Sequence, residues 1–70
     1  MEPLTLWRHY KGNIYILIAL SRLEATLEPH VVYKKGEGIY GEYWVRPLSE
    51  WHQEVSPGVR RFTKVEGNPE

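Results

Sequence analysis

Large and polar residues alternate along the first segment of the chain, residues 5–11. Leu6, Arg8 and Tyr10 would share one side of an extended strand, and Trp7, His9 and Lys11 the other. A period of two residues is typical of a half-buried β-strand. Gly12 and Asn13 follow, and both residue types tolerate the positive φ angles of tight turns. The pattern therefore predicts a first strand and a hairpin into the next segment.

The second segment, residues 14–20, is apolar on both sides of an extended chain. One side carries Ile14, Ile16, Ile18 and Leu20, and the other carries Tyr15, Leu17 and Ala19. A buried helix is an alternative for residues 14–27, but the density of β-branched residues and the preceding turn favour a strand. A strand that is apolar on both faces must be covered on both. We therefore expect self-association, as a homodimer or higher oligomer, through the strand from Ile14 to Leu20.

The rest of the chain alternates short extended segments with turns. Residues 21–28 could end the second strand or form a turn of helix, and both interpretations stay open. Proline lacks an amide donor, so Pro47 should end a strand. The predicted elements are a third strand (30–35), a turn (36–38), a fourth strand (39–46), a helical turn (48–53), a turn (56–58) and a closing strand (59–65).

These elements predict an all-β fold. We expect a small five-stranded bent sheet or partly open SH3-like barrel, with one short helical turn before the last strand. The 70 residues should form a single domain, with an ordered core over about residues 5–65 and a frayed tail over 66–70. Because the chain has no cysteine, aromatic residues, at 13% of the sequence, must supply much of the core.

Charge and composition narrow the function classes. The net charge is zero, which argues against a protein that coats nucleic acid. All nine acidic residues are glutamate, so the aspartate of many catalytic triads and magnesium sites is missing. We expect no enzyme, no metal and no cofactor. The N-terminus lacks the basic and apolar regions of a signal peptide, and the longest apolar run is too short to cross a membrane. A soluble, cytoplasmic protein is therefore expected.

The densest mixture of rings and charge lies in residues 41–51. Trp44 and Arg46 would share one side of the fourth strand there, as Trp7 and His9 do on the first. Flat rings stack on bases, and an arginine guanidinium binds phosphate or carboxylate. This combination predicts a site for a small, anionic, nucleotide-derived ligand, and sequestration of a signal nucleotide is one role open to such a site. The candidate ligand-binding residues are Trp7, Arg8, His9, Tyr33, Trp44 and Arg46.

Three alternatives stay open. The rings could simply be the core of a domain without disulfides, with Arg46 at its rim. A basic stripe could bind single-stranded nucleic acid, formed by Lys34, Lys35, Arg60, Arg61 and Lys64. An aromatic groove could bind a peptide, formed by Tyr43, Trp44 and Trp51.

Three motifs in this order resemble a family of small bacterial and phage domains, domain of unknown function 1653. They are His9-Tyr10-Lys11-Gly12-x-x-Tyr15, then Val31-Val32-Tyr33, then Trp44-Val45-Arg46-Pro47-Leu48. The resemblance covers about residues 7–64 and is weaker at Ala25-Thr26. It implies a compact β-rich domain and supplies no activity and no catalytic residues.

Overall fold

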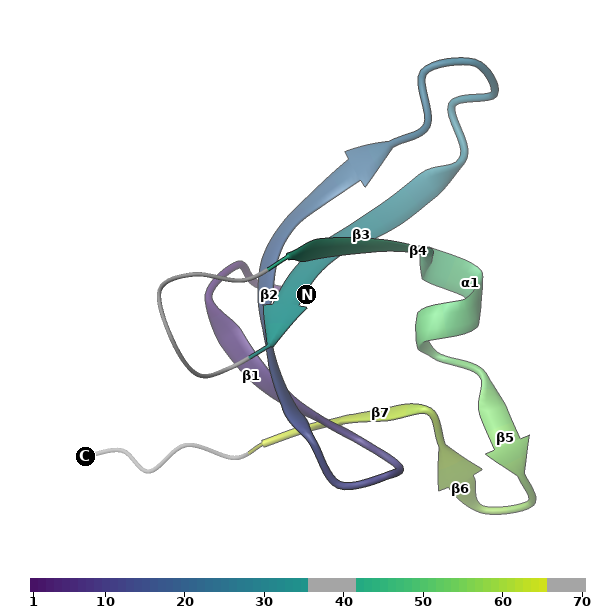
Figure 1. The fold of residues 1–70 in the computed structure, drawn as a ribbon. Coiled ribbons are helices and arrows are strands. Elements are labelled where there is room, and N and C mark those ends of the chain that lie inside the picture. Colours follow the sequence, from purple (N-terminus) through teal and green to yellow (C-terminus); the bar gives the residue numbers. More distant parts are fainter. Residues whose placement is uncertain (36–41, 66–70) are drawn as a thin grey trace.

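A computed structural model of the protein describes residues 1–35 and 42–65, which form a bent antiparallel sheet, one helical turn and a small hairpin (Figure 1). The five-stranded sheet has the order β4-β3-β2-β1-β7, and β5 and β6 form the separate hairpin. The elements are β1 (Thr5–His9), β2 (Ile14–Arg22), β3 (Pro29–Lys35), β4 (Tyr43–Pro47), α1 (Leu48–Trp51), β5 (Glu54–Ser56), β6 (Val59–Arg60) and β7 (Phe62–Lys64).

The first three predicted strands are confirmed. Gly12 adopts a φ of 110° in the turn between β1 and β2, and its amide donates a hydrogen bond to the His9 carbonyl at 2.7 Å. The second segment is a strand and not a helix, and it continues to Arg22, with a bulge between Leu17 and Ala19. The open question over residues 21–28 is thereby answered: they finish the strand and then turn.

The prediction of one continuous closing strand over residues 59–65 is wrong. The chain is interrupted at Arg61, so that β6 pairs with the unpredicted β5 while β7 pairs with β1. The Arg61 amide donates to the Gln53 carbonyl, and the Arg61 carbonyl accepts from the Tyr10 amide, both at 2.9 Å. Arg61 is therefore the residue at which the chain changes partners.

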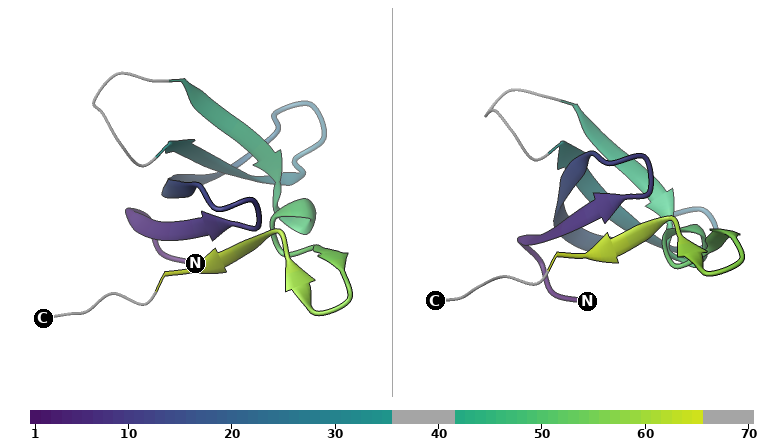
Figure 2. Two further views of the ribbon diagram at one scale, coloured as in Figure 1. Left: turned by 60° about the horizontal axis from the view of Figure 1, so that its bottom comes forward. Right: turned by 90° about the horizontal axis from the view of Figure 1, so that it is seen from below.

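The sheet curves strongly but does not close into a barrel (Figure 2). Strands β4 and β7 form its two edges. The fourth strand is described from Tyr43 and ends at Pro47, as predicted. The helical turn is shorter than expected and ends at Trp51. The predicted turn at 36–38, residues 39–41 of the predicted fourth strand and the tail at 66–70 lie outside the described residues.

Aromatic rings make up most of the core on the inner face of the sheet. Trp51 has no exposed surface, and its ring stacks on that of Phe62 with centroids 3.7 Å apart and planes 6° apart. Trp7 and Tyr33 approach Trp51 edge-on, at centroid distances of 5.6 and 4.9 Å. Leu17 and Val31 complete the buried set. The stack joins α1 to β7, so the helical turn connects both edges of the sheet.

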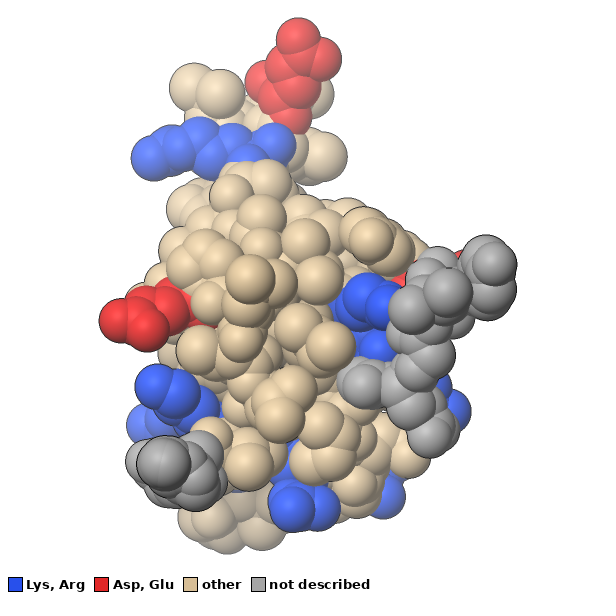
Figure 3. All heavy atoms as spheres, turned by 90° about the vertical axis from the view of Figure 1, so that its left-hand side faces the viewer, with Lys and Arg blue, Asp and Glu red and all other residues tan. Residues whose placement is uncertain are grey.

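The outer face of the sheet carries apolar residues that the chain covers only in part. The strand register places Leu6 beside Ile16 on this face, and Val32 beside Val45. Leu6 and Val45 are exposed, while Ile16 and Val32 are half-buried. Figure 3 views the molecule from this side and shows a largely uncharged middle with lysine and arginine around it. Self-association through β2 stays a prediction.

Candidate functional site

Two arginines from opposite edges of the sheet are anchored beside the same helical turn. Arg46 lies on β4, and its Nη1 donates to Glu50 Oε1 in α1 at 3.0 Å. Arg61 immediately precedes β7, and its Nη2 donates to Gln53 Oε1, two residues after α1, at 3.2 Å. We call Arg46 and Arg61 the arginine pair. The stack of Trp51 on Phe62 fixes the two chain segments that carry the pair.

Each arginine of the pair keeps an unused hydrogen-bond donor. The Nε atoms of Arg46 and Arg61 are buried and have no hydrogen-bond partner within residues 1–35 and 42–65. The Nε1 atom of Trp51 is also buried and has no hydrogen-bond partner among these residues. A buried donor left unpaired costs about 1–3 kcal/mol, and native structures leave few of them. The Arg46 side chain is 29% exposed, so an anion would contact the accessible part of its guanidinium.

The half-buried His9 shows that the positive charges act on a common region. Burial lowers the pKa of His9 from its ordinary value of 6.5, and the charges of Arg46, Lys11 and Arg61 lower it further. Its Nδ1 accepts a hydrogen bond from the Lys11 amide at 3.2 Å, which requires that nitrogen to be unprotonated. The region is therefore positive, and burial together with these charges favours the neutral form of His9 by lowering its pKa.

Trp44 adds an accessible flat ring on the same face of β4 as Arg46. It pairs across the strands with buried Tyr33, and Arg46 pairs with buried Val31, so both side chains lie on the inner side of the sheet. Trp44 nevertheless sits at the edge strand and is 48% exposed. A ring in this position can stack on a planar group.

The six predicted ligand-binding residues fall into three groups in the structure: core residues, one outer-face residue and three residues on the inner side of the sheet. Trp7 and Tyr33 are core residues, as the structural alternative proposed. Arg8 is exposed on the outer face, opposite to His9. His9, Trp44 and Arg46 lie on the inner side, where the positive charge of Arg46 acts on His9.

Two further residues of the site were not among the predicted ones. Lys11 shares a side of the first predicted strand with His9, and this shared side is the signal that points to it. Arg61 was considered only as part of a basic stripe. The signal that could have found it is the interruption of an alternating strand by two consecutive arginines, Arg60 and Arg61, before a buried phenylalanine.

The structure places the residues of the two alternative surfaces on several elements. Trp51 is fully buried, and Tyr43 and Trp44 are adjacent residues on opposite faces of β4, so these three rings form no common groove. Within the basic stripe, Lys34 and Lys35 lie on β3 while Lys64 lies on β7, with β2 and β1 between them. Binding of single-stranded nucleic acid or of a peptide stays a prediction.

Metal ligands do not cluster in the described part of the chain. Residues 1–35 and 42–65 contain no group of three histidine or glutamate side chains that could hold a metal ion. In the same residues, no helix is long and apolar enough to span a bilayer.

The fold and its motifs match a known family. A family model described as "Protein of unknown function (DUF1653)" matches residues 5–64. The chain belongs to this DUF1653 family. A crystal structure of a DUF1653 protein from Bordetella bronchiseptica is similar to it, with 33% sequence identity and a TM-score of 0.76. The alignment covers 100% of this chain and 95% of that one. No curated protein matches the chain.

Membership confirms the resemblance carried by the three sequence motifs. The family description assigns no activity, ligand or partner. Any function for this DUF1653 domain therefore has to be argued from its own residues.

Proposed function

We propose that this DUF1653 protein is a non-catalytic binding module for a small, anionic, nucleotide-derived ligand. The observation that carries the proposal is the arginine pair: two guanidinium groups anchored beside one helical turn, each with a buried Nε that has no partner among the described residues. Guanidinium groups with free donors are the side chains best suited to phosphate.

The charges around the pair favour an anion. Lys11 lies close enough to influence His9 together with Arg46 and Arg61. Glu50 is the acidic residue that forms an ion pair with Arg46, and it is exposed. Three positive charges against one partly solvated carboxylate leave a local positive excess in a protein whose net charge is zero. An anion bound there would be attracted both by charge and by the free donors.

The exposed Trp44 ring would bind the base of the ligand, while the arginine pair binds its phosphate. It lies two residues from Arg46 on the same face of the strand. A base stacked on this ring would place its phosphate toward the arginine pair, a combination that a simple inorganic anion cannot use. Sequestration of a nucleotide signal is one role that such a module could perform.

Binding without chemistry fits the side chains around the site. The chain has no cysteine and no aspartate. Among the described residues, no serine hydroxyl is hydrogen-bonded to a histidine, which is the pairing that activates a serine nucleophile. The surroundings of the arginine pair thus offer electrostatic attraction and stacking.

A thermal-shift screen with ribonucleotides and cyclic dinucleotides tests the proposal. Nucleosides and inorganic phosphate are the matched controls. A nucleoside provides the base without the phosphate, and inorganic phosphate provides the anion without the base. We expect at least one nucleotide to raise the unfolding temperature more than either control. Stacking should also quench the fluorescence of Trp44, the exposed tryptophan, and Trp44→Phe should remove that quenching while leaving the buried tryptophans unaffected.

Two results would contradict the proposal. One is the absence of stabilisation by any nucleotide of the screen. The other is binding only to long single strands, with an affinity that grows with strand length and falls steeply with salt, as for a nucleic-acid-binding surface.

A further inference from the structure

The hairpin between β2 and β3 extends beyond the rest of the molecule. We call residues 20–29 the hairpin arm; in Figure 1 it rises past the end of β4, and in Figure 3 it stands off the body as a knob with both basic and acidic side chains. Three leucines of the arm are exposed: Leu20 at 48%, Leu23 at 47% and Leu27 at 60%. The arm thus presents apolar side chains to solvent at some distance from the core.

Leu27 is held in a conformation that leucine rarely adopts. Its φ is 64°, in the left-handed region, which costs a residue with a Cβ roughly 1–2 kcal/mol. The Leu27 amide donates to the Leu23 carbonyl at 2.6 Å, and the Leu23 amide donates to the Glu28 carbonyl at 2.9 Å. A glycine would satisfy this turn better, and the exposed leucine side chain gains little burial within its own chain.

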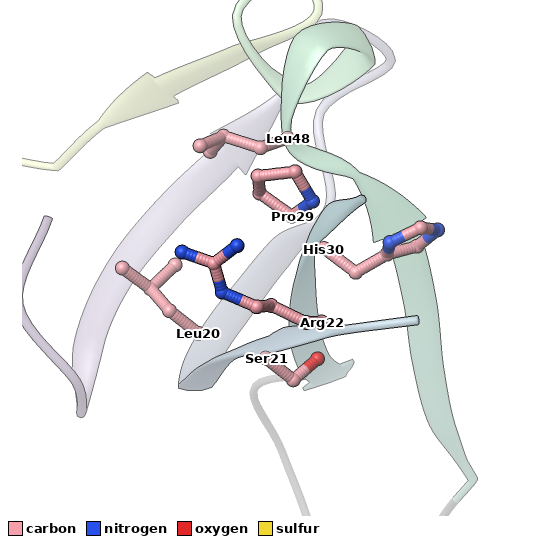
Figure 4. Close-up of a pocket in the computed structure, with 6 residues that line it drawn as sticks. All are labelled: Leu20, Ser21, Arg22, Pro29, His30 and Leu48. Carbon is pink, nitrogen blue, oxygen red and sulfur yellow. The ribbon is translucent and has the colours of Figure 1, made fainter. Parts of the chain in front are cut away.

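A groove with an apolar floor lies at the base of the same arm (Figure 4). The groove has a volume of about 560 Å³. Its apolar floor is formed by Leu20, Pro29 and Leu48. A second hollow of about 370 Å³ adjoins it through Pro29 and Leu48. The arm therefore carries an apolar knob at its tip and an apolar groove at its base.

The arm carries two side chains of opposite charge, Arg22 and Glu24. Arg22 extends along the groove at the base, and its only side-chain hydrogen bond within the described residues joins Nη1 to the Leu27 carbonyl at 3.3 Å. Glu24 lies at the tip and has no ion pair in residues 1–35 and 42–65. An exposed acid at the tip and a basic residue at the base would meet if two arms lay antiparallel.

We propose that the hairpin arm binds a second copy of this chain in a two-fold dimer. The tip of each arm enters the groove of the other copy, so that Leu27 packs against Leu20, Pro29 and Leu48 of its partner. Arg22 of each copy then faces Glu24 of the other. A two-fold axis makes both contacts twice, as an isologous interface requires. The proposal does not depend on the ligand and involves neither residue of the arginine pair.

Replacement of Leu27 by glycine separates its role in the dimer from its role in the fold. Leu27→Gly should raise the stability of the monomer, because it relieves the left-handed backbone. It should weaken the dimer on the order of tenfold or more, because an interface anchor is lost. Leu4→Gly is the matched control: Leu4 is also exposed and has a φ of 63°, but it lies before β1, outside the arm. It should stabilise the monomer and leave the dimer unchanged.

A charge exchange tests the pairing of the arms directly. Arg22→Glu and Glu24→Arg should each sediment as a monomer where the wild type is a dimer, because each variant sets like charges against one another at both contacts. An equimolar mixture of the two variants should recover the dimer, since both contacts are then complementary again. The measurement is sedimentation velocity up to millimolar protein.

Three outcomes would overturn the proposal. The first is a wild-type protein that stays monomeric at millimolar concentration. The second is a dimer that Leu27→Gly and both charge variants leave intact. The third is a dimer that is lost in Val45→Glu, on the outer face of the sheet, but not in the arm variants.

Discussion

Arg46 makes a side-chain contact with α1 and keeps one donor without a partner among the described residues. Its ion pair with Glu50 is an i,i+4 pair whose carboxylate is exposed. Such pairs contribute about 0.3–0.5 kcal/mol, so the fold does not depend on Arg46. The contact instead fixes the direction of the guanidinium and leaves Nε without a partner in the described part of the chain. Arg61 is held by Gln53 in a similar way.

His9 should make the stability of the fold depend on pH. Because its pKa is lowered on folding, chiefly by burial, the unfolded chain binds the proton more readily than the folded one. Its contribution to stability should therefore be complete above the ordinary value of 6.5 and should be lost as the pH falls from there through the lowered pKa.

Urea unfolding at a series of pH values measures this effect. The free energy of unfolding of wild type should fall below pH 6.5 more steeply than that of His9→Gln, and the exposed His52→Gln should behave as wild type. A wild-type protein whose stability changes with pH in parallel with that of His9→Gln would contradict the assigned role of His9.

The helical turn α1 is the element that assembles the site. With four residues and no side-chain cap, it is too short to be stable by itself. The fully buried Trp51 holds it against Phe62 of β7, while Pro47 connects it directly to β4. The turn therefore exists because its tryptophan is buried, and Glu50 and Gln53 reach the arginine pair as a consequence.

The turn between β1 and β2 is the second element on which the site depends, because it carries Lys11 and positions His9. Gly12 has a φ of 110° with open space where a side chain would begin, so Gly12→Ala should act through the backbone alone. We expect a loss of about 1–3 kcal/mol. For a domain of this size each kcal/mol lowers the melting temperature by about 4–8 °C.

Thermal unfolding followed by circular dichroism checks this expectation. The neighbouring Lys11→Ala is the control and should leave the melting temperature nearly unchanged, since Lys11 is exposed. An unaltered melting temperature for Gly12→Ala would show that the turn does not constrain the hairpin.

For the whole molecule, the sequence predicted those strands and turns that depend on local side-chain patterns. The alternation in residues 5–11 and the apolar residues 14–20 identified two strands, since side-chain period and turn chemistry are local properties. The same alternation placed Trp44 and Arg46 on one face. The two consecutive arginines mark an interruption of the last strand, but the new strand partners and the position of Arg61 beside α1 depend on the packing of Trp51 on Phe62, which the local pattern does not specify.

We propose that the arginine pair binds an anionic ligand between the edge strands β4 and β7. Calorimetric titration with the nucleotide that stabilises the protein most tests it directly, using Arg46→Ala, Arg61→Ala and the adjacent, exposed Arg60→Ala as control. We expect each variant of the pair to fold and to bind roughly 10- to 100-fold more weakly, the loss of one charged hydrogen-bonding partner. Arg60→Ala should bind as wild type. Unchanged affinity in both variants of the pair, or an equal loss in Arg60→Ala, would contradict the account.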